Sequence, residues 1–83
     1  MRGMTPEILA SLRERFPQGV RVELLRMDDP QAPAIGTRGT VRGVDDTGSI
    51  MVAWDSGGSL HVLFGVDECR IIGKSSGMKS RGD

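Results

Sequence analysis

Cysteine and histidine are almost absent from this chain of 83 residues, which has one of each, Cys69 and His61. A single cysteine cannot form an intramolecular disulfide, and two soft ligands are too few for a structural zinc site, which takes four. The sequence therefore indicates no metal site and no cofactor. A domain of this size holds a modest core and often needs an additional source of stability, which leaves tight packing or self-association.

Aromatic residues and long apolar runs are also scarce. The chain has one tryptophan, two phenylalanines and no tyrosine, whereas readers of proline-rich peptides and of single-stranded nucleic acids display several exposed aromatics. Both classes are disfavoured. The longest apolar stretches are about four residues, far short of a membrane span, and Met1–Met4 offers no apolar core of a signal peptide. We expect no membrane association and a reducing, cytoplasmic location.

The chain has no excess of charge of either sign, since it has eleven basic and eleven acidic residues. A duplex-binding module is usually strongly basic, because its affinity comes largely from neutralising phosphates. The balance argues against a dedicated DNA binder but does not exclude a local basic patch. Five arginines fall on predicted strands or beside them and form either an anion-binding edge or scattered surface charge: Arg21, Arg26, Arg38, Arg42 and Arg70.

Residues 1–17 are predicted to form an N-terminal helix. Thr5 suits the N-cap, Pro6 the first helical position, and Glu7 the positive end of the helix dipole. We expect this helix to dock on the rest of the chain, and a partner-binding helix is the alternative. Its apolar stripe consists of Ile8, Leu9, Leu12 and Phe16.

From Val20 onward, apolar residues alternate with a period of two, which is typical of strands. Thr37–Val44 is the predicted second strand, Asp45–Gly48 a hairpin turn, and Cys69–Ile72 a short fifth strand. Two further strands lie between them. The inward-facing set, predicted to form the core, is Val22, Leu24, Val41, Val44, Ile50, Val52, Trp54, Leu60, Val62, Phe64 and Ile71.

Five short strands with tight turns and one long first loop predict a mainly β fold. We expect a small five-stranded SH3-like barrel over residues 18–73, with the short α-helix in front. Twelve glycines fit a small barrel that bends sharply at its corners. Residues 74–83 are polar and mildly basic, which predicts a disordered tail.

The stretch Gly36–Asp45 (GTRGTVRGVD), followed by Val52–Gly58 (VAWDSGG), is similar to many SH3-like barrels, including the Mind-bomb/Herc2 type. More closely, the run from Phe16 to Ile72 resembles the domain of unknown function 4314 family. The points of match are Gly19–Leu24, Met27–Pro30, Pro33, Ile35–Thr37, Gly39–Val41, Val44–Asp46, Trp54–Asp55 and Gly65–Asp67.

This resemblance implies an origin but no activity. Members of the family look like small proteins or modules of bacteriophages and conjugative elements, largely from anaerobic gut bacteria. A role against host defence, in the cytoplasm of a bacterial host, is what the resemblance implies. It transfers no catalytic or binding residue.

No constellation of catalytic residues stands out, and we expect that the protein is not an enzyme. A hydrolytic triad needs a base beside its nucleophile, and the only histidine, His61, lies between Leu60 and Val62 and so points away from the core. Cys69 alternates inward with Ile71 and is expected to act as a small apolar core group.

The predicted binding surface lies on the long loop Asp28–Arg38 and the turn at Asp45–Asp46. The loop is longer than a hairpin needs, and its two prolines restrict its backbone. The acidic pairs Asp28–Asp29 and Asp45–Asp46 also suit turns, and neither is followed by the residue spacing of a calcium-binding loop. Alternatively, Ile35 folds over the open end of the barrel as a lid. The candidate binding residues are Asp28, Asp29, Arg38, Arg42, Asp45 and Asp46.

Several apolar residues have the opposite parity to the predicted core. A barrel has one interior, so these residues need another cover, from the helix or from a second copy of the chain. The candidate self-association face consists of Leu25, Met27, Met51 and Leu63.

Two functions remain open at this point. The first is a non-catalytic binding module of a phage or mobile element that blocks or sequesters a host defence protein or a small signalling nucleotide. The alternative is an accessory barrel that binds nucleic acid or nucleoprotein, as barrels of the KOW kind do, and the neutral charge disfavours it.

Overall fold

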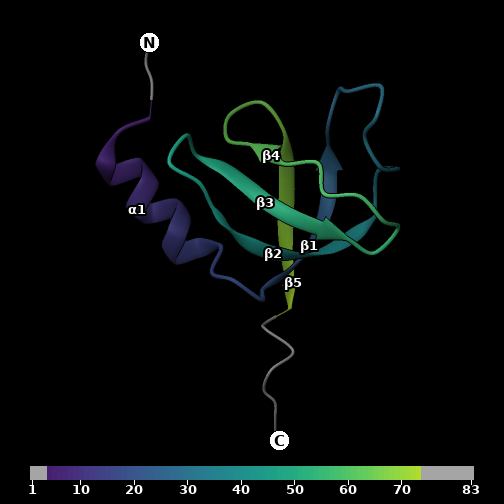
Figure 1. Ribbon diagram of the computed structural model, residues 1–83, viewed down its shortest axis with the longest axis horizontal. Coiled ribbons are helices and arrows are strands. Elements are labelled where there is room, and N and C mark those ends of the chain that lie inside the picture. Colours follow the sequence, from purple (N-terminus) through teal and green to yellow (C-terminus); the bar gives the residue numbers. More distant parts are fainter. Residues whose placement is uncertain (1–3, 74–83) are drawn as a thin grey trace, which may run out of the picture.

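The computed structural model of the protein describes residues 4–73 (Figure 1). Residues 1–3, and the polar tail predicted at 74–83, lie outside the described residues. The elements are α1 (Pro6–Arg15), β1 (Arg21–Arg26), β2 (Arg38–Val44), β3 (Ser49–Trp54), β4 (Val62–Leu63) and β5 (Glu68–Gly73). The helix has ten residues and is not long and apolar enough to cross a membrane.

The helix begins where the capping pattern predicts. The side-chain oxygen of Thr5 accepts a hydrogen bond from the backbone N–H of Ile8 at 3.1 Å, and Pro6 is the first helical residue. The helix ends at Phe16, whose N–H donates to the carbonyl of Leu12 at 2.8 Å. Both Leu12 and Phe16 are buried, so the apolar stripe docks α1 on the sheet.

The strands form one antiparallel sheet in the order β4-β3-β2-β1-β5. A mainly β fold with one short helix is therefore confirmed. The expected closed barrel is not, because the two edge strands, β4 and β5, do not pair with each other. β4 has only two residues: the chain before it forms a turn at Asp55–Gly57, and the carbonyl of Leu60 accepts a hydrogen bond from the Trp54 indole N–H at 2.8 Å.

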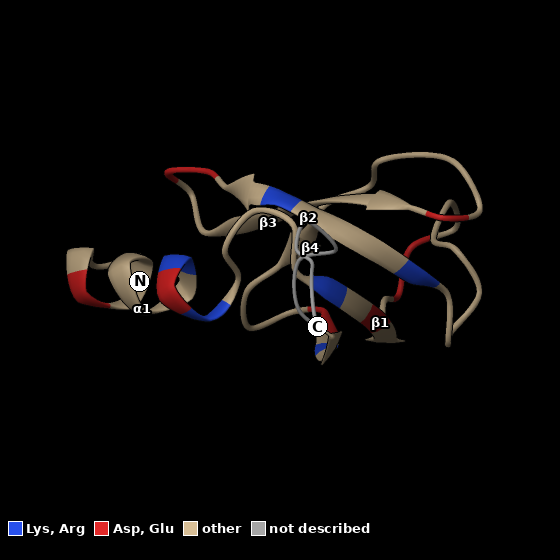
Figure 2. Cartoon of the chain, turned by 90° about the horizontal axis from the view of Figure 1, so that it is seen from below, with Lys and Arg blue, Asp and Glu red and all other residues tan. Residues whose placement is uncertain are grey.

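The sheet folds over on itself, so that β2 and β3 run across β1 and β5 with the core between them (Figures 1 and 2). Gly39 on β2 lets core side chains of the neighbouring strand β3 pack over the backbone of β2. A Cβ atom at this position would lie 2.6 Å from Cγ1 of Val52 and 2.9 Å from Cε3 of Trp54. Any side chain at residue 39 would therefore displace these two core side chains of β3.

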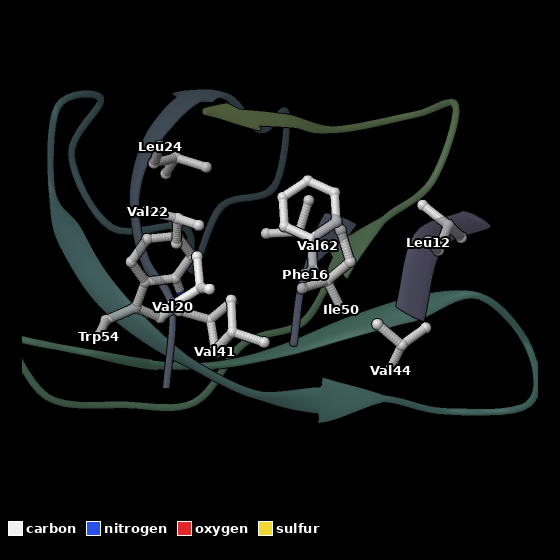
Figure 3. Close-up of a cluster of buried hydrophobic side chains, with 11 residues drawn as sticks. Leu12, Phe16, Val20, Val22, Leu24, Val41, Val44, Ile50, Trp54 and Val62 are labelled. Atoms are coloured by element: carbon white, nitrogen blue, oxygen red, sulfur yellow. The ribbon is translucent and has the colours of Figure 1, made fainter. Parts of the chain in front are cut away.

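The core contains most of the predicted residues (Figure 3). The prediction was wrong for Leu60, which is only half-buried, and for Phe64 and Ile71, which are close to half exposed. Phe64 begins a turn after β4, and Ile71 lies on an edge strand. The helix adds two side chains that the predicted core set omitted. The buried hydrophobic residues are Leu12, Phe16, Val20, Val22, Leu24, Val41, Val44, Ile50, Val52, Trp54 and Val62.

Candidate functional site

The predicted binding residues lie at two ends of β2. Asp28 and Asp29 belong to the loop before β2, and Arg38 is its first residue. Asp45 and Asp46 follow its last residue. At about 3.3 Å per residue, the two groups are about 20 Å apart along the strand. The structure therefore does not bring them into one patch (Figure 1), and Arg42 is an exposed residue between them.

The acidic pairs build turns. One carboxylate oxygen of Asp45 accepts hydrogen bonds from the Thr47 hydroxyl at 2.6 Å and from the N–H groups of Thr47 and Ser49 at 3.0 Å each. These bonds, that from the Thr47 hydroxyl foremost, lower the pKa of Asp45. Asp29 likewise accepts from the N–H of Gln31 at 2.8 Å. Within residues 4–73, no group of three or more acidic, histidine or cysteine side chains is placed to hold a metal ion.

Three of the predicted surface charges, Arg21, Asp46 and Arg70, form ion pairs within the protein. The Arg21 guanidinium grips both oxygens of Asp55, at 2.9 and 2.5 Å, and this hydrogen bonding holds the pKa of Asp55 below its usual range. The ion pairs of the described part are Arg13–Asp46, Arg21–Asp55 and Arg70–Glu23.

The chain has eleven basic and eleven acidic residues and no net charge. A phosphate-binding surface usually has an excess of basic residues, and this chain has none.

The residues of the candidate self-association face line two hollows and one strand. Leu25 lines a hollow beside α1, whereas Met27 and Leu63 line another of about 360 Å³ that also contains Asp28 and His61. Met51 lies on β3 opposite Gly43. The hollows lined by Leu25 and by Met27 with Leu63 share Val66 and Asp67, and self-association stays a prediction.

A further hollow, of about 280 Å³, lies between α1 and the turn that connects β4 to β5, and we call it the α1 groove. Its floor is part of the core, formed by Leu12, Phe16, Ile50 and Val62. A second hollow of about 240 Å³ shares Leu12, Arg15 and Phe64 with it and continues along the helix to Glu7 and Ile8.

Exposed apolar side chains gather at the wall of this groove. Phe64 is 47% exposed, Leu25 42% and Val66 60%. Several apolar side chains that are exposed around one hollow indicate a contact surface. Charged residues surround them at the rim: Arg15, Arg26, Asp67 and Glu68.

The turn between β4 and β5 holds the wall in place. The carboxylate of Asp67 accepts from the N–H of Leu63 at 2.9 Å, and the N–H groups of Val66 and Asp67 donate to the carbonyl of Leu63 at 3.1 and 2.9 Å. Gly65 has a φ of +83°, which other residues rarely adopt. The glycine at residue 65 and the aspartate two residues later predict a connection at Gly65–Glu68, and the turn begins one residue before it, at Phe64.

Cys69 lies in the groove and is half-buried, which confirms that it packs against the core. Burial raises the pKa of its thiol to about 11, and the nearby positive charge of Arg15 opposes this only in part. The thiol is therefore protonated at neutral pH and is a poor nucleophile. His61 is exposed, as predicted, and lines the other hollow.

These features define a small open-sheet β protein with one docked helix and an apolar groove at the helix–sheet junction. The chain belongs to the family described as Domain of unknown function (DUF4314), whose match covers residues 5–72. The matched region contains α1 and nearly all of the sheet, and so the whole α1 groove. A comparison with the curated proteins found no match.

Proposed function

We propose that this protein is a non-catalytic binding module that captures a partner protein through the α1 groove. One observation carries the proposal: the half-exposed Phe64, Leu25 and Val66 lie around a single hollow whose floor is buried core. Interfaces of this kind are anchored by a few apolar side chains that fill such pockets. An apolar partner side chain buried there contributes about 1.5–3 kcal/mol.

The proposal extends to the fold and the biological setting. We regard the sheet as an SH3-like barrel left open at the seam between β4 and β5, with the α1 groove at that seam. The resemblance of the family to proteins of phages and mobile elements supports a bacterial host factor, such as a defence protein, as the partner that is blocked or sequestered. The apolar lining supports a protein rather than a small signalling nucleotide.

No observation favours the nucleic-acid alternative. The chain has no net charge, and three arginines of the described residues are held in ion pairs. A gel shift with duplex DNA at several salt concentrations tests this directly. Strong binding that weakens steeply with salt would replace the proposed function with the nucleic-acid one.

The capture experiment uses the full chain, immobilised and exposed to a bacterial host lysate, with bound proteins identified by mass spectrometry. The test variant combines Leu25→Ser with Phe64→Ser. Its control is Ile35→Ser, which removes an apolar side chain that is 60% exposed from the long loop. We expect one protein to be captured by the wild type and the control, and lost with the test variant.

A second comparison decides between the groove and the surface predicted from sequence. The double variant Asp28→Ala and Arg38→Ala changes one exposed loop residue and the exposed first residue of β2, and it should alter the free energy of unfolding by less than about 1 kcal/mol. We expect it to capture the partner normally. Loss of capture with this variant, and normal capture with the groove variant, would place the binding surface on the loop instead.

A further inference from the structure

The edge strand β5 lies beside the α1 groove with one side unpaired. Of the elements in the described part, only β1 pairs with it, and β5 ends the sheet. In Figure 1, β1 lies on one side of β5 and α1 on the other. An unpaired edge presents a row of backbone donors and acceptors.

The hydrogen bonds of β1 fix which groups of β5 face outward. The N–H of Leu24 donates to Thr37 and its carbonyl accepts from Gly36, both at 2.8 Å, so the backbone of Leu24 faces the β2 side. Because alternate residues face opposite sides, Glu23 faces β5 and pairs there with Arg70. The N–H and C=O groups of the two residues beside Arg70, Cys69 and Ile71, therefore point away from β1.

The start of this free edge borders the α1 groove. Glu68 and Cys69, at the start of β5, line the α1 groove on one side, and Arg15 and Phe16 line it on the other. Outside the sheet, the described residues form no backbone hydrogen bond with Cys69 or Ile71. The groove is thus a slot between a helix and an edge strand with free backbone groups.

We propose that an extended segment of the partner pairs with β5 as a sixth strand and inserts an apolar side chain into the α1 groove. This inference rests on the proposed function and specifies how the partner is held. Backbone hydrogen bonds to Cys69 and Ile71 would supply the pairing, and the groove would supply the selectivity, as in other cases of strand addition.

A single segment fits this slot better than a second copy of the chain. An added strand needs about 4.8 Å beside β5, but the β5 of a second copy would bring its own β1 against α1. The register that pairs Cys69 with Ile71 of the second copy would also place the two Arg70 side chains opposite each other. Like charges in that position are destabilising.

The charges at the rim indicate the chemistry of the segment. Within residues 4–73, Arg15 and Arg26 form no ion pair, unlike Arg13, Arg21 and Arg70. Both line the groove. Asp67 and Glu68 line the groove too, and they also form no ion pair within residues 4–73. Side chains two residues apart share one face of a strand, so the segment should carry an apolar and a charged residue two positions apart.

The test begins with a display library of random dodecapeptides, panned on the full chain. We expect enrichment of peptides with an apolar and a charged residue at positions i and i+2. Enrichment at helical spacing, i and i+3 or i+4, or no enrichment at all, would overturn strand pairing. Neither result depends on the capture experiment, which tests the groove itself.

The enriched peptide is then synthesised with single N-methyl groups along its backbone. Methylation at alternate amides, which face β5, should weaken binding about tenfold or more, since each removes a hydrogen bond and adds a clash. Methylation at the amides between them should change affinity less than about twofold. A uniform effect along the peptide would contradict pairing with β5.

Proline substitutions test the same contact from the protein side. Ile71→Pro removes an outward N–H, which an edge strand tolerates, whereas Arg70→Pro removes an N–H that faces β1 and should unfold the sheet. We expect folded Ile71→Pro to bind the peptide at least about tenfold more weakly, and Ile71→Ala to bind normally. If Ile71→Pro fails to fold, the N-methyl series decides.

Two results separate this inference from the proposed function. Capture that depends on Phe64 but is unchanged in folded Ile71→Pro would retain the groove and reject strand pairing. Capture that is unchanged in both variants would reject both.

Discussion

Arg13 of α1 donates two hydrogen bonds to the carbonyl oxygen of Val44, from Nε at 3.2 Å and from Nη2 at 3.1 Å. Nη2 also contacts the carboxylate of Asp46 at 2.8 Å. These bonds join the helix to the end of β2. They therefore fix the position of the element that forms one wall of the α1 groove.

Replacing Arg13 with alanine should lower the free energy of unfolding by about 1 kcal/mol, because the carbonyl of Val44 loses a charged donor. Asp46→Asn is the control. The Asp46 side chain is 94% exposed, so its loss should change stability by less than about 0.5 kcal/mol. Urea unfolding measures both, and equal effects of the two variants would contradict the role assigned to the Val44 contact.

Acid should destabilise the protein partly through Asp55. Its pKa is depressed in the folded state by the hydrogen bonds from Arg21, so its contribution is present above the unfolded pKa of about 3.9 and is lost as pH falls through the folded pKa. Urea unfolding between neutral and strongly acidic pH should show a smaller loss in Asp55→Asn than in the wild type. If the free energy of unfolding falls by the same amount with pH in the two proteins, Asp55 does not make this contribution.

Trp54 is the only tryptophan and is 4% exposed. Trp54→Ala should cost about 3–5 kcal/mol, enough to unfold much of so small a domain. Trp54→Phe keeps most of the volume but leaves the carbonyl of Leu60 without its donor, at a cost of about 1–3 kcal/mol. Circular dichroism follows both variants, and near-normal melting of Trp54→Ala would be inconsistent with a buried indole.

The Cys69 thiol should react slowly with alkylating reagents. With a pKa raised by burial to about 11, its thiolate fraction at pH 8 is roughly a hundredfold below that of an ordinary cysteine. The rate should keep rising with pH up to about 11 and should fall further when a peptide occupies the groove. Rapid labelling at pH 8 in native conditions, as fast as in urea, would show that the thiol is not held in the groove wall.

Local signals in the sequence predicted the parts of the fold that local interactions determine. Thr5 and Pro6 place the start of α1, and Asp45 with Gly48 places the hairpin between β2 and β3. Both features depend on contacts between residues close together in the chain. The alternation of apolar residues also gave four of the five strands within a few residues of their bounds.

The errors concern features that only long-range pairing determines. Alternation through Leu60 and Phe64 predicted a long fourth strand, but hydrogen bonds from Trp54 and to Leu63 hold these residues outside it. Because β4 stays short, the sheet does not close and Ile71 is left on an edge. The α1 groove follows from that open seam, and no spacing of residues in the sequence would have revealed it.

The position of β1 has a consequence for the synthesis of the protein. This strand pairs with β2 on one side and with β5 on the other, and the ion pair that ties it to β5 joins residues 47 positions apart. A contact of such sequence separation forms late in folding, after the local hairpins. A nascent chain therefore cannot complete its sheet until Gly73 has left the ribosome, and premature release before that point yields a product without the strand that borders the groove.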